Sequence, residues 1–224
     1  MDRVVEELGT LLVVCHANIC RSPLIEHLLR RELAGAGVAG GIRVESAGTH
    51  AIVGAELCVV CARAIEDDDA LAASDGGDAH RARQLDVEML DRADLVIVAS
   101  GAERAAAARI SPASRDRTFT LLEAAALAEV MADRDGDHAL APGATGAALR
   151  SLAEGLAAQR GLATPVAAPQ PPRGRWARLF SRETEPPATF DLDDVHMLGV
   201  DGHQPMIETA RGAVARFADF ALTR

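Results

Sequence analysis

Short apolar runs alternate along the chain with longer segments in which apolar residues recur every three or four positions. Thr10–Val14 and Leu95–Val98 are continuous runs, typical of strands buried on both faces. Ile42–Ser46 alternates between apolar and polar side chains, as a strand with one exposed face does. Thr118–Leu121 is a further short run rich in β-forming residues. The pattern therefore predicts four strands.

Segments with helical spacing lie between and after these strands. Leucine and isoleucine recur on one face from Leu24 to Leu33, and the preceding Ser22 and Pro23 suit a helix cap and a first helical position. Further helices are predicted at 56–66, 84–91, 102–109, 122–132, 147–160 and over the apolar face that runs from Met206 to Ala221. Strands alternating with helices predict an α/β fold, a three-layer sandwich in which a four-stranded parallel sheet has helices on both faces.

Two segments interrupt this pattern. Residues 67–78 are acidic and rich in glycine, which favours a loop. Residues 164–189 are rich in proline and arginine, and we interpret them as an insertion rather than a second domain. The chain is thus expected to form a single domain over residues 1–224 that carries this insertion.

Composition and charge exclude several classes of protein. The formal net charge of the 224-residue chain is -10, and all 23 basic residues are arginine, so a broad nucleic-acid-binding surface is not expected. No apolar run approaches the roughly 18 to 20 residues that cross a bilayer, so no transmembrane segment is predicted. The acidic N-terminus lacks the pattern of a secretory signal, and four cysteines are too few for a secreted disulfide scaffold. We therefore expect a cytoplasmic protein.

The segment Cys15–Pro23 carries the most informative chemistry. Five residues separate Cys15 from Arg21, enough for a loop whose backbone N–H groups converge on one oxyanion. The loop leads into a predicted helix N-terminus, which favours negative charge, and Arg21 can clamp two phosphoryl oxygens. The same groups would stabilise the thiolate of Cys15, which is the reactive form of the side chain. These residues predict thiolate attack on phosphorus, at the end of a buried strand where α/β proteins bind ligands.

The same segment resembles the signature of the low-molecular-weight protein tyrosine phosphatases, Cys-x-Gly-Asn-x-Cys-Arg-Ser-Pro, with Ala17 in place of glycine. If the loop needed a positive φ at this position, alanine would strain it. The resemblance covers most of residues 10–130 and the C-terminal region. Besides the signature, it rests on Glu45–Thr49, Ala82–Leu85, Ala93–Ile97 and Phe119–Glu123.

The resemblance implies the phosphotyrosine phosphatase I type of fold and hydrolysis of phosphomonoesters through a phospho-cysteine on Cys15, with Arg21 as the clamp. The expected substrate is a phosphorylated protein, foremost one carrying phosphotyrosine, or a small phosphate ester; no metal or cofactor is expected. Ser22 would donate a hydrogen bond to the thiolate, and Asn18 would hold the shape of the loop, in part through Ser46. The residues expected to bind the phosphate group are His16, Ala17, Asn18, Ile19, Cys20 and Ser22.

The family also uses an aspartate, usually followed by proline, to protonate the leaving group. The segment Asp193–Gly199 resembles that loop, with Val195 in place of proline, and it implies Asp194 as the general acid. Asp191, Asp193 and Asp201 are alternatives. The aromatic residues that accompany this loop in the family are missing, which weakens the expectation of selectivity for an aromatic ring.

The remaining cysteines leave two further functions open. In the family, a cysteine at position 20 can form a reversible disulfide with the nucleophile, but Cys20 can equally be a small buried side chain. Cys58 and Cys61 are separated by two residues, which is the spacing of many redox-active and metal-binding cysteine pairs. Because no second pair accompanies them and a helix is predicted there, packing in the core is favoured. If Cys58 and Cys61 lay near Cys15, arsenate reduction would be possible. A phosphate-binding regulatory protein with reduced turnover is the other alternative.

Overall fold

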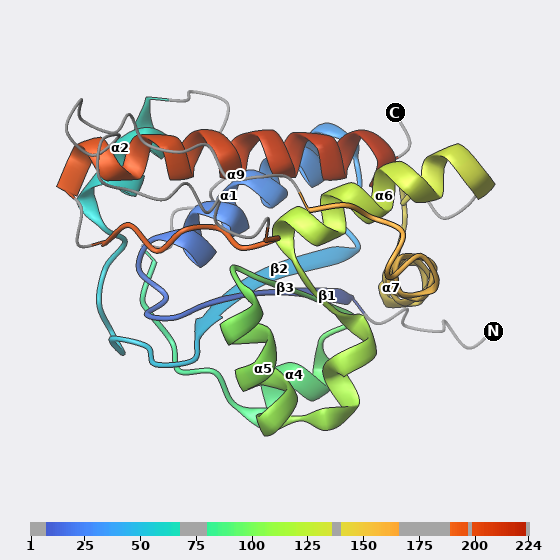
Figure 1. Ribbon diagram of the computed structural model, residues 1–224, viewed down its shortest axis with the longest axis horizontal. Helices are drawn as coiled ribbons and strands as arrows, with labels where there is room; N and C mark the ends of the chain where they lie inside the picture. The colour runs from blue at the N-terminus through green and yellow to red at the C-terminus, as the bar shows by residue number, and fades with distance from the viewer. Residues whose placement is uncertain (1–7, 68–79, 136–139, 166–188, 197–198, 223–224) are drawn as a thin grey trace, which may run out of the picture.

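The structure is a computed structural model that describes residues 8–67, 80–135, 140–165, 189–196 and 199–222. Nearly all of the loop predicted at 67–78 and of the insertion predicted at 164–189 lies outside the described residues. The described helices and strands are arranged in three layers around one sheet (Figure 1).

Four parallel strands form the sheet in the order β2-β1-β3-β4, which confirms the predicted fold class. Residue pairing aligns the carboxyl ends of the strands, since Cys15 lies opposite Gly48 and Val14 lies opposite Val98. These ends therefore form one edge at which loops from three strands meet. The strands are β1 Gly9–Cys15, β2 Ile42–Gly48, β3 Leu95–Val98 and β4 Thr118–Thr120.

Helices cover both faces of the sheet. In Figure 1, α1, α6 and α9 lie over one face, and α4 and α5 lie under the other. Helix α7 packs against β1 and the 3₁₀ helix η1. None of the helices in the described part of the chain is both long and apolar enough to cross a membrane. The helices are α1 Arg21–Gly35, α2 Val59–Glu66, α4 Val87–Arg92, α5 Gly101–Ile110, η1 Pro112–Arg117, α6 Leu121–Asp135, α7 Gly146–Ala158 and α9 Gly199–Ala221.

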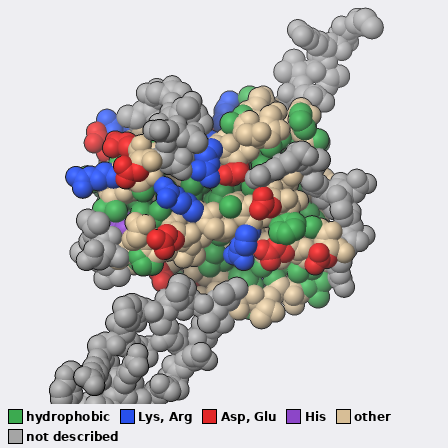
Figure 2. Space-filling model, turned by 90° about the horizontal axis from the view of Figure 1, so that it is seen from above, with side chains coloured by type: hydrophobic (Ala, Val, Ile, Leu, Met, Phe, Trp, Pro, Cys, Tyr) green, Lys and Arg blue, Asp and Glu red, His purple; other side chains and the backbone are tan. Residues whose placement is uncertain are grey.

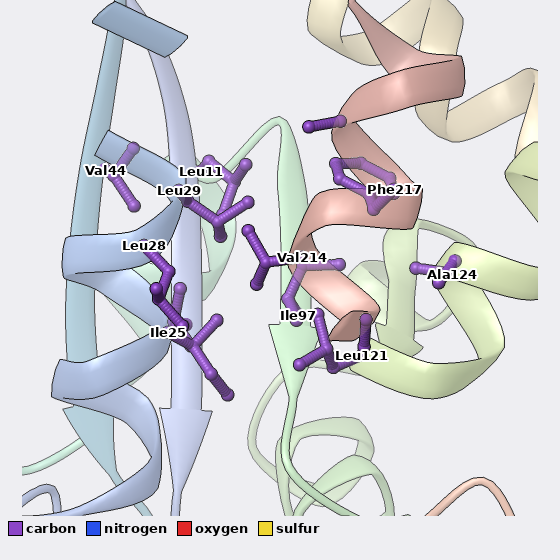
Figure 3. Close-up of a cluster of buried hydrophobic side chains, with 14 of the residues drawn as sticks. Leu11, Ile25, Leu28, Leu29, Val44, Ile97, Leu121, Ala124, Val214 and Phe217 are labelled. Carbon is purple, nitrogen blue, oxygen red and sulfur yellow. The ribbon is translucent and has the colours of Figure 1, made fainter. Parts of the chain in front are cut away.

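Side chains of β1 alternate between two buried apolar clusters, as the pleat of a strand requires. Leu11 and Val13 belong to the larger cluster, with side chains of α1, α6, α7 and α9. Leu12 and Val14 belong to the smaller one, with Leu90 of α4. Figure 3 shows part of the larger cluster, in which Leu11 of β1 lies beside Leu29 of α1, and Val214 and Phe217 of α9 lie on the side of α6. Burial on both faces explains the continuous apolar run of β1.

The first helix begins earlier than the sequence predicts. Its N-cap is Cys20 and its first residue is Arg21, whereas Ser22 was the predicted cap. Ser22 does not cap the helix because its hydroxyl hydrogen-bonds to the Cys15 sulfur instead. Pro23 then sits in the first turn, where a missing N–H costs nothing.

Two other helices begin later than predicted. Helix α2 starts at Val59 rather than at residue 56. The N–H of Cys58 donates to the carbonyl of Ile19, and this bond holds the residues before Val59 against the loop between β1 and α1. Helix α4 starts at Val87 rather than at residue 84, because Gln84 forms an isolated bridge with Gly48. In both places a contact distant in sequence overrides the local preference for helix.

Charges of both signs mix on the face shown in Figure 2, which is the upper face of Figure 1. Arginine and acidic side chains lie interspersed there among hydrophobic ones. The charge on the described part of this face is therefore not gathered into one basic area.

Replacing Leu28 tests the importance of the larger cluster. Leu28 is fully buried between α1 and the sheet, so Leu28→Ala should lower the free energy of unfolding by about 2 to 5 kcal/mol. Urea denaturation of both proteins gives this difference. Val53→Ala is the matched control because Val53 is 71% exposed. Equal losses in the two variants would contradict the packing described.

Candidate active site

The loop from Cys15 to Cys20 occupies the carboxyl edge of the sheet and connects β1 to α1. It lies beside the end of β2 through backbone hydrogen bonds, from Thr49 N–H to the Cys15 carbonyl and from His50 N–H to the His16 carbonyl. On the other side, the N–H of Ala99 donates to the carbonyl of Val14. The fold thus fixes both flanks of the loop at the site where parallel sheets bind ligands.

The sulfur of Cys15 is buried and accepts two hydrogen bonds. The hydroxyl of Ser22 donates to it at 3.0 Å, and the backbone N–H of Asn18 donates at 3.2 Å. The sulfur also lies at the N-terminal end of α1, where the helix dipole favours negative charge. The Cys15 sulfur therefore faces hydrogen-bond donors from the loop and from the first turn of α1.

Asn18 is the centre of the hydrogen bonds that shape the loop. Its amide nitrogen donates to Ser22 Oγ and to Ser46 Oγ, both at 2.9 Å. Its side-chain oxygen accepts from the N–H of Arg83 at 2.8 Å, and its carbonyl lies 2.7 Å from His80 Nε2. The contact with Ser46 matches the one expected from the resemblance. Asn18 therefore ties the loop to β2 and to the segment before α4.

The backbone of the loop explains why alanine is tolerated at position 17. Among the described non-glycine residues, only Asn18 has a positive φ, 57°. Asparagine adopts this conformation more readily than most residues, so Ala17 imposes no strain of this kind. A constraint that does require glycine lies opposite, at Gly48. A Cβ atom there would come within 2.7 Å of the His16 carbonyl oxygen and 3.0 Å of the Ala17 carbonyl carbon.

Arg21 is buried at the same edge and contacts two carboxylates. One guanidinium nitrogen lies 2.5 Å from Asp194 Oδ2 and 3.7 Å from Glu103 Oε1. The other donates to the carbonyl of Leu192 at 3.2 Å. Glu103, in the first turn of α5, is itself buried, and sequence reasoning missed it. The sequence did contain a clue to Glu103, because an acidic residue shortly after a buried strand is expected at the carboxyl edge of the sheet.

The segment 189–196 brings Asp194 to this edge. Leu192 and Val195 are buried in the larger apolar cluster, and the N–H of Leu192 donates to the carbonyl of Ala99. Valine in place of proline therefore anchors this segment by packing. Among the alternatives, Asp191 accepts from the N–H of Gly101, Asp193 is exposed, and the Asp201 side chain lies outside the described residues.

The residues expected to bind phosphate lie in one loop and the first turn of α1, but some of their side chains are exposed and others are buried. His16 is exposed and its ring stacks on that of His50, with centroids 4.6 Å apart. Ile19 and Cys20 are buried in the larger apolar cluster. Any contact of these two residues with phosphate would come from their backbone.

Behind the loop, the sulfurs of Cys20 and Cys58 lie within 4.8 Å of each other, and Cys61 follows in the first turn of α2. The hydrogen bond from Cys20, together with one from Cys61, lowers the pKa of Cys58 far below its usual range, and the contact with Cys58 raises the pKa of Cys20. Cys61 is fully buried, as core packing predicts, but Cys58 is half-buried at the N-cap of α2. All four cysteines are free thiols.

A pair of substitutions separates the two contributions of Asn18. Asn18→Gly removes the side-chain hydrogen bonds but accepts the positive φ, whereas Asn18→Ala also strains the backbone. We expect both variants to unfold at lower urea concentration than the unaltered chain, with Asn18→Ala less stable than Asn18→Gly by about 1 kcal/mol. An alanine variant as stable as the glycine variant would show that the positive φ does not constrain the loop.

Comparison with known proteins shows which proteins the chain is similar to. The family described as low molecular weight phosphotyrosine protein phosphatase matches residues 10–132. A probable low molecular weight protein-tyrosine-phosphatase, EpsP of Ralstonia nicotianae, is 38% identical over 118 residues, which are 52% of this chain and 72% of EpsP. The low molecular weight protein-tyrosine-phosphatase Etp of Escherichia coli is 34% identical over 115 residues, 50% of this chain and 69% of Etp.

A solved structure shows the same fold. The crystal structure of the tyrosine phosphatase Wzb from Escherichia coli K30 in complex with sulphate superposes with a TM-score of 0.55 and covers 95% of this chain and 97% of Wzb. At 18% sequence identity, this likeness shows the fold alone.

Proposed function

Since the chain belongs to the low molecular weight phosphotyrosine protein phosphatase family, and is therefore a phosphoric monoester hydrolase, we propose that it removes phosphate from protein phosphotyrosine by way of a phospho-cysteine on Cys15. One observation carries the assignment of Cys15. Its sulfur accepts hydrogen bonds from Ser22 and Asn18 in a loop that ends at Arg21 and the N-terminus of α1.

In the first step, the thiolate of Cys15 attacks phosphorus. The new S–P bond forms as the P–O bond to the leaving group breaks, and Asp194 transfers its proton to the departing oxygen. Arg21 and the loop N–H groups neutralise the charge on the phosphoryl oxygens. Because Arg21 is paired with Asp194 in the structure, we infer that the incoming phosphate takes over part of this guanidinium while Asp194 becomes protonated.

In the second step, water attacks the phospho-cysteine. The carboxylate of Asp194 takes a proton from this water, the S–P bond breaks, and inorganic phosphate and the Cys15 thiolate are released. The hydrogen bond from Ser22 stabilises the departing thiolate. Protein residues supply every group in this scheme, and no metal or cofactor takes part.

The surroundings of the proposed reaction follow from its chemistry. A thiolate nucleophile is active only when it is kept reduced, which supports the cytoplasm as the compartment. A phosphorylated protein is the proposed partner, with a small phosphate ester as the simplest alternative. Binding rests on local groups, because a net charge of -10 offers no long-range attraction to an anion.

Removing the nucleophile tests the assignment of Cys15. Cys15→Ser should abolish hydrolysis of an aryl phosphate and of a phosphotyrosine peptide, since a serine hydroxyl is not ionised at neutral pH. Release of inorganic phosphate measures both reactions. Cys61→Ala is the matched control, because Cys61 is buried outside the loop, and it should remain active. Equal turnover by Cys15→Ser and the unaltered chain would refute the mechanism. Retention of phosphate without turnover in the unaltered chain would favour a binding protein.

Changing the leaving group tests the assignment of Asp194. Asp194→Asn should slow hydrolysis by about 100-fold or more for an alkyl phosphate, whose oxygen leaves poorly without a proton. The loss should be much smaller for an aryl phosphate whose phenol is a strong acid. Asp193→Asn is the matched control because the neighbouring Asp193 side chain is exposed. A loss that is the same for every leaving group would assign Asp194 to positioning rather than to proton transfer.

Arsenate reduction is a second candidate because the structure brings thiols together behind the loop. Arsenic bound to Cys15 would be reduced from As(V) to As(III) as two thiols lose two electrons and form a disulfide, which a dithiol must then reduce. The contact of Cys20 with Cys58 favours this reading. Adding arsenate and a dithiol to the Cys15→Ser comparison separates the two functions. Consumption of the dithiol that depends on both arsenate and Cys15 would support reduction.

A further inference from the structure

Four donor side chains lie together behind the phosphate loop, and the proposed hydrolysis uses none of them. They are Cys20, Cys58, His196 and His203, which we call the Cys20 cluster. Their ligand atoms all lie within 4.8 Å of one another. The four residues come from separate parts of the fold: the N-cap of α1, the N-cap of α2, the segment that carries Asp194, and helix α9. Two sulfurs and two imidazoles therefore converge from four elements.

The spacing of these atoms fits a tetrahedral metal ion. With bonds of ~2.0 to 2.3 Å, the donors of a tetrahedral zinc site lie about 3.3 to 3.8 Å apart. Cys20 Sγ is 3.1 Å from His196 Nδ1 and 3.7 Å from His203 Nε2. The two imidazole rings are inclined at 77°, so their nitrogens approach the sulfur from different directions. Small side-chain rotations suffice to place all four donors around one ion.

The chemistry of the donors selects the class of ion. Two thiolates and two neutral imidazoles are a common ligand set for zinc, and their two negative charges balance Zn²⁺. Cys58 lies at the N-cap of α2, where the backbone dipole favours the thiolate, and a bound Zn²⁺ ion would itself favour loss of the Cys20 proton. Cys20 and His203 are buried, Cys58 is half-buried and His196 is exposed, so an ion can enter from the His196 side.

We propose that the Cys20 cluster binds one Zn²⁺ ion. The ion would join the phosphate loop to the acid-bearing segment, because Cys20 precedes Arg21 and His196 lies two residues after Asp194. That segment already contacts the loop through the ion pair of Arg21 with Asp194. Bound zinc would hold this arrangement closed, and it would withdraw Cys20 and Cys58 from thiol redox chemistry. The proposal is independent of the phosphatase reaction.

Direct metal binding tests the proposal. The full chain, reduced and freed of metal, is titrated with ZnCl₂ and with CoCl₂. We expect one ion per chain and, for cobalt, the intense visible absorption of a tetrahedral thiolate complex. His196→Gln, His203→Gln and Cys58→Ser should each weaken zinc binding by about 100-fold or more. Zinc should also raise the thermal midpoint of the unaltered chain but not that of His196→Gln.

Two control variants guard against binding elsewhere. Cys15→Ser removes the buried thiol of the loop between β1 and α1, and His50→Gln removes a histidine that stacks on His16 of the same loop; both variants should bind zinc as the unaltered chain does. His196 is exposed, so His196→Gln should fold even if the buried variants do not. The proposal would be overturned if His196→Gln bound zinc as tightly as the unaltered chain, if Cys15→Ser lost binding, or if cobalt gave the weak spectrum of a six-coordinate ion.

Discussion

The proposed active site depends on a sulfur atom held at the junction of β1 and α1 and surrounded by hydrogen-bond donors. Ser22 and the backbone of Asn18 donate to this sulfur, and the first turn of α1 faces it. Such a sulfur can be held only if the loop turns tightly. The loop turns through the positive φ of Asn18 and lies close against Gly48, where a side chain would clash. The need to place hydrogen-bond donors around this sulfur therefore explains the residues found at positions 18, 22 and 48.

The second constraint is the charge balance at Arg21. A buried guanidinium needs a counter-charge, and here it has two carboxylates, a buried one from Glu103 and a half-exposed one from Asp194. Glu103 is held by α5 and also accepts a hydrogen bond from the hydroxyl of Ser100. Asp194 is carried by a short segment anchored by Leu192 and Val195. Glu103 is buried and Asp194 is half-exposed, so a phosphate group bound at the proposed site would compete with Asp194 for the guanidinium.

The sequence was sufficient for features that depend on local pattern. The apolar runs of β1 and β3 and the helical faces that follow predicted the sheet and its two covered faces. Helix ends were wrong where a distant group competed, as when the Ser22 hydroxyl bound sulfur instead of capping α1. Glu103 was missed because nothing in its neighbourhood along the chain shows that it faces Arg21. The contact between Cys20 and His203 spans 183 residues, so counting cysteine pairs along the sequence could not reveal it.

The central claim is that phosphate passes through the sulfur of Cys15. It is tested most directly by quenching the enzyme in acid within milliseconds of mixing with an aryl phosphate, and by locating the phosphoryl group on its peptides by mass spectrometry. The account predicts one phosphoryl group on the peptide that contains Cys15, bound to sulfur and lost under conditions that cleave thiophosphates. Turnover without that species, or a phosphoryl group on another residue, would contradict it.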